Sequence, residues 1–246
     1  MAPNQRVNRM EPHADGAAPS NLDRITTRWP AVGDPVQFVL RYAPAVRKYL
    51  DALLRDPHDA DEVEQEFLAR VVERGFANAD PARGRFRDYL KTAVRNAALN
   101  YLRGKRRAPQ ADVGELPLAG PEGEQAWVVG WQRCALDKAW RGLDQHQTRT
   151  PGNLFHTVLR LSVDHPDEDS EALAARAAAL AGRPLRADAF RKQLSRARRL
   201  FAELLLQEVT GTLEAPTPHQ VEEELIELGL MPYIADFLPD DWRRTV

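Results

Sequence analysis

Hydrophobic residues recur at spacings of three and four along most of the chain, which is the period of an amphipathic helix. No stretch alternates hydrophobic and polar residues as a half-buried strand would. In the first half the pattern predicts helices at about 35–54, 59–74 and 85–103. In the second half it predicts helices at about 124–143, 150–163, 170–181, 187–209 and 218–228. The sequence therefore predicts an all-α fold.

Proline, glycine and capping residues mark the ends of these helices. Pro35 suits the first position of a helix, where its missing N–H is not needed, and Pro44 is expected to kink that helix. Asp59 is expected to cap the second helix, because Glu62 follows it three positions later. Gly75 follows the last turn. Further along, Thr150 with Pro151, Ser170, and Thr217 with Pro218 are expected to begin helices, and Gly182 and Gly229 to end them.

Two segments lack this helical period. Residues 1–28 are rich in proline, alanine and charge, and we expect them to form a disordered tail. Residues 104–124 contain four glycines and three prolines, and we expect a flexible linker at 108–124. The sequence thus predicts two helical domains joined by a linker, at 29–107 and 125–210, followed by a helical extension at 211–246.

Composition excludes several classes of protein. The chain has 246 residues, 43% of them hydrophobic and 28% charged, which is an ordinary globular composition. Its one cysteine, Cys134, allows neither an intrachain disulfide nor a cysteine-based zinc site. No hydrophobic run approaches the roughly 18 residues of a membrane span, and the start lacks the apolar core of a signal peptide. We therefore expect a cytoplasmic protein that does not contact membranes.

No motif for catalysis is found. The sequence holds no Ser/His/Asp or Cys/His arrangement and no glycine-rich phosphate loop, and its six histidines are scattered singly. We expect no enzymatic activity, no catalytic residues, no metal and no cofactor.

One segment is strongly basic although the chain has a formal net charge of -2. Residues 81–107 carry nine Lys and Arg side chains, and Asp88 is their only acidic residue. The hydrophobic stripe of this helix consists of Phe86, Leu90, Ala93, Val94, Ala97 and Tyr101. Cationic groups beside amides suit a phosphate backbone with bases within reach. The candidate DNA contacts are Arg85, Arg87, Lys91, Arg95, Asn96, Asn100, Arg103, Lys105, Arg106 and Arg107. The alternative is a solvated basic face, favoured by the helix dipole.

The preceding helix is acidic. Residues 56–66 contain six carboxylates and no Lys or Arg. Its hydrophobic stripe consists of Ala60, Val63, Phe67 and Val71. A second line of side chains is a candidate docking edge for a basic protein partner, formed by Asp61, Glu62, Gln65, Leu68 and Val72. The alternative is that Leu68 and Val72 pack against the first helix.

The two helices together resemble a known family. The stretch DADEVEQEFLARVVERGF, at 59–76, followed by DPARGRFRDYLKTAVRNAALNYLRGKRR, at 80–107, resembles region 2 of bacterial RNA polymerase sigma factors of the extracytoplasmic-function (ECF) type. The resemblance covers 36–107. It implies that the helix with Asp61, Gln65 and Leu68 binds the clamp of core RNA polymerase. It also implies that the loop 77–85 and the next helix bind the melted non-template strand of the minus-ten promoter element.

The helices at 170–181 and 187–209 have the layout of a helix-turn-helix, joined by a short segment with Gly182. The hydrophobic stripe of the second helix is Phe190, Leu194, Ala197, Phe201 and Leu204. The candidate base-reading residues are Asp188, Arg191, Lys192 and Ser195, and the candidate phosphate contacts are Arg196, Arg198 and Arg199. The alternative is an amphipathic helix with a solvated basic face. After a region 2 and a linker, this unit resembles sigma region 4, which implies binding to the duplex minus-thirty-five element and to the polymerase flap. The segment between its helices is longer than in typical members.

The last residues, from 215, resemble the acidic extension of atypical ECF-like factors of planctomycete-type bacteria. We expect its apolar residues to complete the core of the second domain, namely Leu225, Leu228, Leu230, Tyr233, Ile234, Phe237 and Trp242. Two alternatives are binding to region 2 in an autoinhibited state and binding of a signalling partner.

These features predict a sigma factor that directs core RNA polymerase to promoters and promotes DNA opening. An anti-sigma or signalling protein is a further expected partner. The near-neutral charge agrees with this function, because a stand-alone repressor usually needs a dominant basic field. Two other functions stay open: a stand-alone helix-turn-helix transcriptional regulator, and a sigma-shaped protein-binding adaptor.

Overall fold

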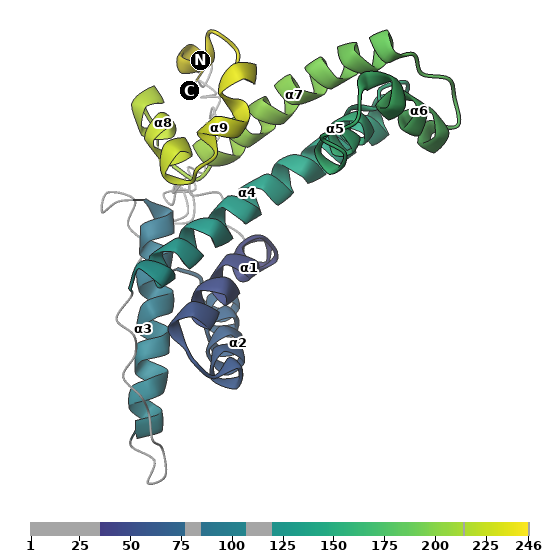
Figure 1. The fold of residues 1–246 in the computed structure, drawn as a ribbon. Helices are drawn as coiled ribbons and strands as arrows, with labels where there is room; N and C mark the ends of the chain where they lie inside the picture. Colours follow the sequence, from purple (N-terminus) through teal and green to yellow (C-terminus); the bar gives the residue numbers. More distant parts are fainter. Residues whose placement is uncertain (1–34, 77–84, 107–119, 214, 246) are drawn as a thin grey trace, which may run out of the picture.

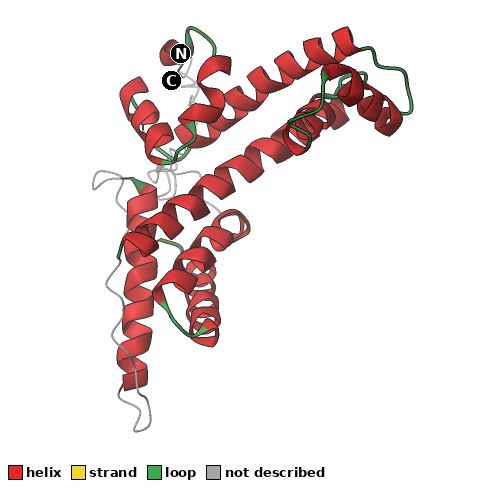
Figure 2. Ribbon diagram, viewed as in Figure 1, coloured by secondary structure: helices red, strands yellow, loops and turns green. Residues whose placement is uncertain are grey.

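The computed structural model describes residues 35–76, 85–106, 120–213 and 215–245. Within these ranges the regular elements are all helices and no strand occurs, as Figure 2 shows. The predicted all-α fold is confirmed. The expected tail at 1–28 and residues 108–119 of the expected linker lie outside the described residues. None of the helices in the described ranges has both the length and the apolar character needed to cross a membrane.

The first three helices pack together. They are α1 (Pro35–Leu53), α2 (Pro57–Arg74) and α3 (Phe86–Arg106), and α1 contacts both of the others. The predicted stripe of α2 is buried in full, at Ala60, Val63, Phe67 and Val71. In α3 the buried hydrophobic residues are Phe86, Leu90, Val94 and Ala98, with Ala93, Ala97 and Tyr101 partly buried beside them. Helical periodicity therefore identified the core side of both helices. Pro44 lies inside α1, which continues through it.

The start of α2 differs from the sequence expectation. The helix begins at Pro57, and the carboxylate of Asp56 caps it by accepting a hydrogen bond of 2.9 Å from the backbone N–H of His58. Proline favours the first helical position, so the helix starts two residues before the expected cap at Asp59. Asp59 is left inside the first turn, where its side chain points to α3. Gly75 ends the helix as predicted, with φ of 60°.

The long helix α4 (Pro121–Arg149) connects the two ends of the molecule, as Figure 1 shows. Residues 121–124, expected in the linker, form its first turn. It packs against α1 near its start and against α7 further along. At the α1 crossing, Trp131 stacks on Tyr42 with ring centroids 4.4 Å apart. Cys134, the only cysteine of the chain, is buried in α4, and this burial raises the pKa of its thiol to about 11.

The next helices are α5 (Phe155–Asp164), α6 (Ser170–Ala181) and α7 (Ala187–Thr210). Pro151 does not begin a helix as expected, because a turn with Gly152 at φ of 91° follows it and α5 starts only at Phe155. Asp169 caps α6 in place of Ser170, since its carboxylate accepts hydrogen bonds from the first turn. Gly182 ends α6 in the left-handed conformation, as predicted. In Figure 1, α7 runs back along α4.

The C-terminal extension consists of α8 (Pro218–Glu227), α9 (Met231–Ile234), the short 3₁₀ helix η2 (Ala235–Phe237) and α10 (Trp242–Thr245). Thr217 and Gln220 form a capping box at the start of α8. The residues expected to complete a core are mostly buried, namely Leu225, Leu228, Leu230, Ile234 and Trp242, whereas Tyr233 is 60% exposed. Both α8 and α9 pack against α7. Figure 1 shows α8 beside the end of α3 at which that helix begins.

Candidate nucleic-acid interface

The solvent side of α3 carries a line of exposed polar residues. Asn96, Asn100 and Arg103 are exposed, because the buried stripe occupies the opposite side of the helix. Arg95 is partly buried. These four predicted contacts therefore lie where a nucleic-acid strand can reach them. The side chain of Arg106 and the whole of Arg107 lie outside the described part of the chain.

Two lysines of the predicted set pair with carboxylates of the protein. Lys91 forms an ion pair with Glu124 in the first turn of α4. Lys105 Nζ lies 2.6 Å from Asp59 Oδ1, which joins the end of α3 to the start of α2. An anion that binds either lysine must therefore compete with an internal carboxylate.

Asp59 and Tyr101 form the centre of this contact between α2 and α3. The Tyr101 hydroxyl lies 2.9 Å from Asp59 Oδ1 and 2.8 Å from Glu62 Oε2, and it donates its one hydrogen within this pair of acceptors. Burial opposes ionisation of Asp59, but the bonds from Lys105 and Tyr101 outweigh it and lower the pKa of Asp59. The contact is thus strongest when Asp59 is ionised.

Arg85 and Arg87, at the start of α3, face the glutamates of α8. Arg85 Nη1 lies 2.7 Å from Glu224 Oε2 and 2.6 Å from Glu227 Oε2. Arg87 Nη2 lies 2.6 Å from Glu227 Oε2, and Arg87 Nε lies 3.0 Å from Glu224 Oε1. The side chains of Arg87 and Glu224 are only 6% and 1% exposed. Both predicted DNA contacts are therefore occupied by carboxylates of the C-terminal extension.

Burial and these ion pairs shift the pKa values of Glu224 and Arg85. Burial disfavours the charged form of Glu224 and raises its pKa, although Arg87 and Arg85 oppose the rise. Burial also opposes the charge of Arg85, but Glu224 and Glu227 outweigh it and raise its pKa. Sequence reasoning missed both glutamates. Their spacing of three, on a helix that buries Val221 and Leu225, was the only signal of a common acidic face.

The predicted docking edge on α2 is partly exposed. Gln65 and Glu62 are exposed, and Val72 is 49% exposed. Leu68 is partly buried against the core. Asp61 pairs with Arg47 of α1, so its charge is partly neutralised within the protein. Glu62, Gln65 and Val72 are the accessible part of this edge.

The predicted recognition residues of α7 are mostly exposed. They are Asp188, Arg191, Lys192, Ser195, Arg196 and Arg199. Arg198 is partly buried: its guanidinium lies 5.5 Å from the ring centre of Phe237 in η2, and its Nη2 lies 3.3 Å from Ser162 Oγ. One residue of the predicted set thus contacts the C-terminal extension.

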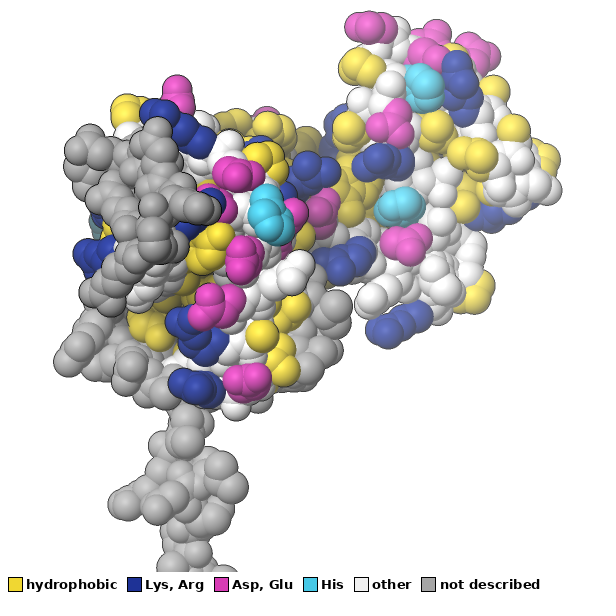
Figure 3. All heavy atoms as spheres, turned by 90° about the horizontal axis from the view of Figure 1, so that it is seen from below, with side chains coloured by type: hydrophobic (Ala, Val, Ile, Leu, Met, Phe, Trp, Pro, Cys, Tyr) yellow, Lys and Arg dark blue, Asp and Glu magenta, His cyan; other side chains and the backbone are white. Residues whose placement is uncertain are grey.

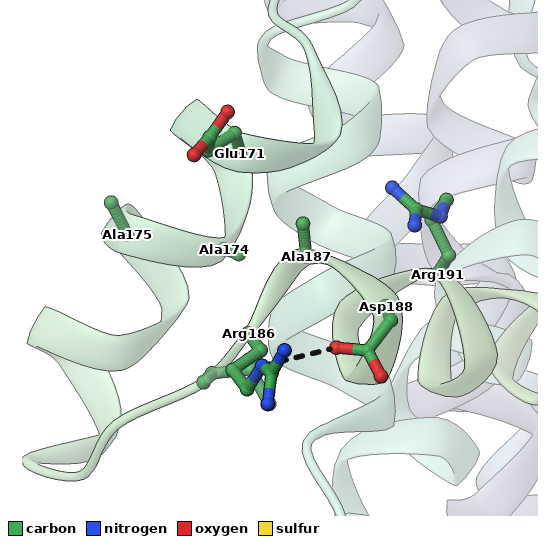
Figure 4. A pocket seen from close by; sticks show the side chains of 8 residues that line it. Glu171, Ala174, Ala175, Arg186, Ala187, Asp188 and Arg191 are labelled. Atoms are coloured by element: carbon green, nitrogen blue, oxygen red, sulfur yellow. Dashed lines mark ion pairs between the residues drawn. The ribbon is translucent and has the colours of Figure 1, made fainter.

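A groove of about 660 Å³ separates α6 from the start of α7. Figure 4 shows Glu171 on its α6 side and Arg186 beside Asp188 on its α7 side, with Nε and Oδ1 3.7 Å apart. Ala174 and Ala175 line the groove with small side chains, which leaves it open. The side chains of Glu171, Asp188 and Arg191 around the groove can form hydrogen bonds with a bound ligand.

The two candidate surfaces lie toward opposite ends of α4, as Figure 1 shows. The 29 residues of α4 span about 43 Å at the rise of an α-helix. Among the described residues on the face seen from below, Figure 3 shows basic and acidic side chains interspersed. In the described ranges, no group of three or more His, Cys, Asp or Glu residues is placed to hold a metal ion.

Comparison with known families identifies a match in the first half of the chain. Residues 38–108 match the model of the family described as Sigma-70 region 2. The match includes most of α1, the whole of α2 and α3, and the segment between them. It supports, in general terms, a role as an RNA polymerase sigma factor, whose family binds core RNA polymerase and promoter DNA. Comparisons with curated proteins and with solved structures found no match.

Proposed function

We propose, on the strength of the match of residues 38–108 to Sigma-70 region 2, that this chain directs core RNA polymerase to specific promoters and promotes DNA opening there. The observation that carries the proposal is the position of Asn96, Asn100 and Arg103, which form an exposed line on α3 within the matched region. This function places the protein in the cytoplasm with the polymerase. It needs binding energy and no covalent chemistry.

The α2 edge is the proposed contact with the clamp of the polymerase. Gln65 and Val72 are exposed on one side of α2, and Glu62 lies near them. An exposed apolar side chain among polar and acidic groups is a suitable anchor for a basic protein surface.

The exposed line of α3 is the proposed contact with the separated DNA strand of the minus-ten element. Arg95 and Arg103 supply positive charge for phosphates, and Asn96 and Asn100 supply amides that hydrogen-bond base edges. Unstacking a base costs a few kcal/mol. Contacts to the captured strand, which include phosphate pairing, offset that cost.

The pair α6 and α7 is the proposed reader of duplex DNA, as in sigma region 4. Arg191, Lys192 and Ser195 lie exposed near the start of α7, where a recognition helix contacts base edges. Arg196 and Arg199 are the proposed phosphate contacts there. The open groove beside Asp188 leaves room for a base edge to approach. We place the chain among sigma factors of the ECF type, in the planctomycete-like group with a C-terminal extension.

Run-off transcription tests this function. Core polymerase from the source organism is incubated with promoter fragments from the same genome, with and without the chain. We expect discrete promoter-specific transcripts only when the chain is present. A chain that neither co-elutes with core polymerase nor supports any transcript contradicts the proposal.

Two sets of variants separate binding from opening. Replacing Asn96, Asn100 and Arg103 together with Ala should keep co-elution with the polymerase and abolish permanganate-detected opening, because all three are exposed and outside the core. Arg149→Ala, at another exposed arginine, is the matched control and should open DNA normally. Gln65→Asp with Val72→Asp should abolish co-elution. Loss of co-elution in the α3 variant would show that this face is misassigned.

A stand-alone DNA-binding regulator is the second candidate, and the exposed basic side of α7 favours it. Such a protein binds specific duplex DNA without polymerase. A gel-shift with the purified chain separates the two functions, since we expect specific complexes only in the presence of core polymerase.

A further inference from the structure

The C-terminal extension places a glutamate between two arginines, Arg85 directly before α3 and Arg87 in its first turn. Glu227 Oε2 lies 2.6 Å from Arg85 Nη1 and 2.6 Å from Arg87 Nη2, so one carboxylate oxygen bridges both guanidinium groups. Glu224 reaches the same two arginines from one turn earlier on α8. Two carboxylates at neighbouring guanidinium groups reproduce the charge pattern of two phosphates.

The two glutamates differ in how easily a competing anion can displace them from the arginines. Glu224 is 1% exposed and lies beside the buried Arg87, so its separation would leave charges buried without partners. Glu227 is 50% exposed and can be solvated when it moves away. Arg85 is 25% exposed and therefore accessible to a competing anion. Glu224 is thus the fixed part of the contact and Glu227 the displaceable part.

The rest of the extension does not need to unfold for this exchange. The buried Val221 and Leu225 of α8 belong to a helix that packs against α7 and α9. Charged side chains make the contact between α8 and the start of α3. A small movement of the last turn of α8, which ends at Glu227, exchanges ion pairs and leaves the apolar packing in place.

We infer, resting on the proposed function, that Glu227 shields Arg85 and Arg87 in the free chain and that a DNA phosphate displaces it when the strand binds α3. Guanidinium groups pair with carboxylate and phosphate in the same forked geometry, so the exchange keeps both arginines paired. Arg85 directly precedes the helix that carries the exposed Asn96 and Asn100, and its side chain is 25% exposed, so a strand along α3 can reach Arg85 while the buried Arg87 keeps its pairing with Glu224. The extension thereby limits DNA binding by the free protein.

Fluorescence anisotropy with a labelled single-stranded oligonucleotide tests the shield. Glu227→Gln keeps the shape of the side chain and removes its charge. Glu222→Gln is the matched control, because Glu222 lies on the same helix but pairs with Arg243 at 2.7 Å. We expect Glu227→Gln to lower the Kd by about tenfold relative to Glu222→Gln, which corresponds to the loss of one charged competitor. Adding Arg85→Gln should remove the gain.

Equal Kd values for the Glu227→Gln and Glu222→Gln variants would overturn the inference, because net charge alone would then explain any change. A second measurement uses the unmodified chain, so it does not depend on how a variant folds. Saturating oligonucleotide should speed hydrogen exchange of the last turn of α8, and unchanged exchange there would also overturn it.

Neither measurement needs polymerase, so the two proposals fail separately. If the chain supports no transcription but Glu227→Gln tightens oligonucleotide binding, only the proposed function fails. If transcription is supported and the two glutamine variants bind alike, only the shield fails.

Discussion

Asp59 joins two helices through side-chain contacts with residues more than forty positions away. The sequence suggested a local role for it, as the cap of α2, because Glu62 follows three positions later. Asp56 and Pro57 take that role, and Asp59 instead pairs with Lys105 and Tyr101. A capping pattern considers only residues that are close together in the sequence. For the same reason, sequence patterns could not identify Glu224 and Glu227 as the partners of Arg85 and Arg87, which are far away along the chain.

Replacing Asp59 with Asn should lower the free energy of unfolding by about 1 kcal/mol at neutral pH, a modest value because solvent screens the partly exposed Lys105. Folding lowers the pKa of Asp59 below its ordinary value of 3.8. Its contribution is therefore complete well above that value and is lost as pH falls through the lower folded pKa. Urea denaturation across this acid range measures the effect. An equally steep acid dependence in Asp59→Asn would contradict the assignment.

Among the elements, the crossing of α1 and α4 depends on a glycine in the middle of a helix. Glycine is unfavourable there by roughly 1 kcal/mol relative to alanine. A Cβ at Gly130 would lie 3.0 Å from the Cα of Ala45, so the missing side chain lets the two backbones approach. Periodicity predicted the helix and its apolar side, but a close backbone approach between helices eighty-five residues apart has no local signature.

Gly130→Ala should lower the free energy of unfolding by about 1–3 kcal/mol, because the backbone of Ala45 cannot yield as a side chain would. Gly104→Ala is the control, since a Cβ there meets no atom within 4 Å. The control should raise stability by about 0.5–1 kcal/mol through helix propensity. Chemical denaturation of both variants measures the difference. Stabilisation by Gly130→Ala would show that the crossing is looser than described.

For the whole molecule, the sequence suggested two domains separated by a linker, and this division stays a prediction. Proline and glycine between 104 and 124 marked a break, yet Pro121 begins a helix and Gly123 lies buried within it. The resulting α4 packs against α1 and α7. Glu208 of α7 adds a polar link, because it pairs with Arg41 of α1 and lies 2.9 Å from Lys138 of α4. Proline and glycine indicate that a helix is interrupted, but they do not tell at which residue the next helix begins.

Glu208→Gln should lower the free energy of unfolding by about 3 kcal/mol, because the Glu208 side chain is 6% exposed and Arg41 would lose its carboxylate partner. Glu203→Gln, on the same helix but partly exposed, should change stability by less than about 0.5 kcal/mol. Urea unfolding followed by circular dichroism measures both. Equal losses in the two variants would mean that the link contributes little.

The buried thiol of Cys134 offers an experimental opportunity. With 5% exposure and a pKa near 11, it stays protonated and sheltered from alkylating reagents at neutral pH. Fluorophores can therefore be attached at two introduced surface cysteines, for example through Tyr233→Cys on α9 together with Lys48→Cys on α1, without first removing the native one. Dye pairs across these positions would report in real time whether the extension moves when a strand binds.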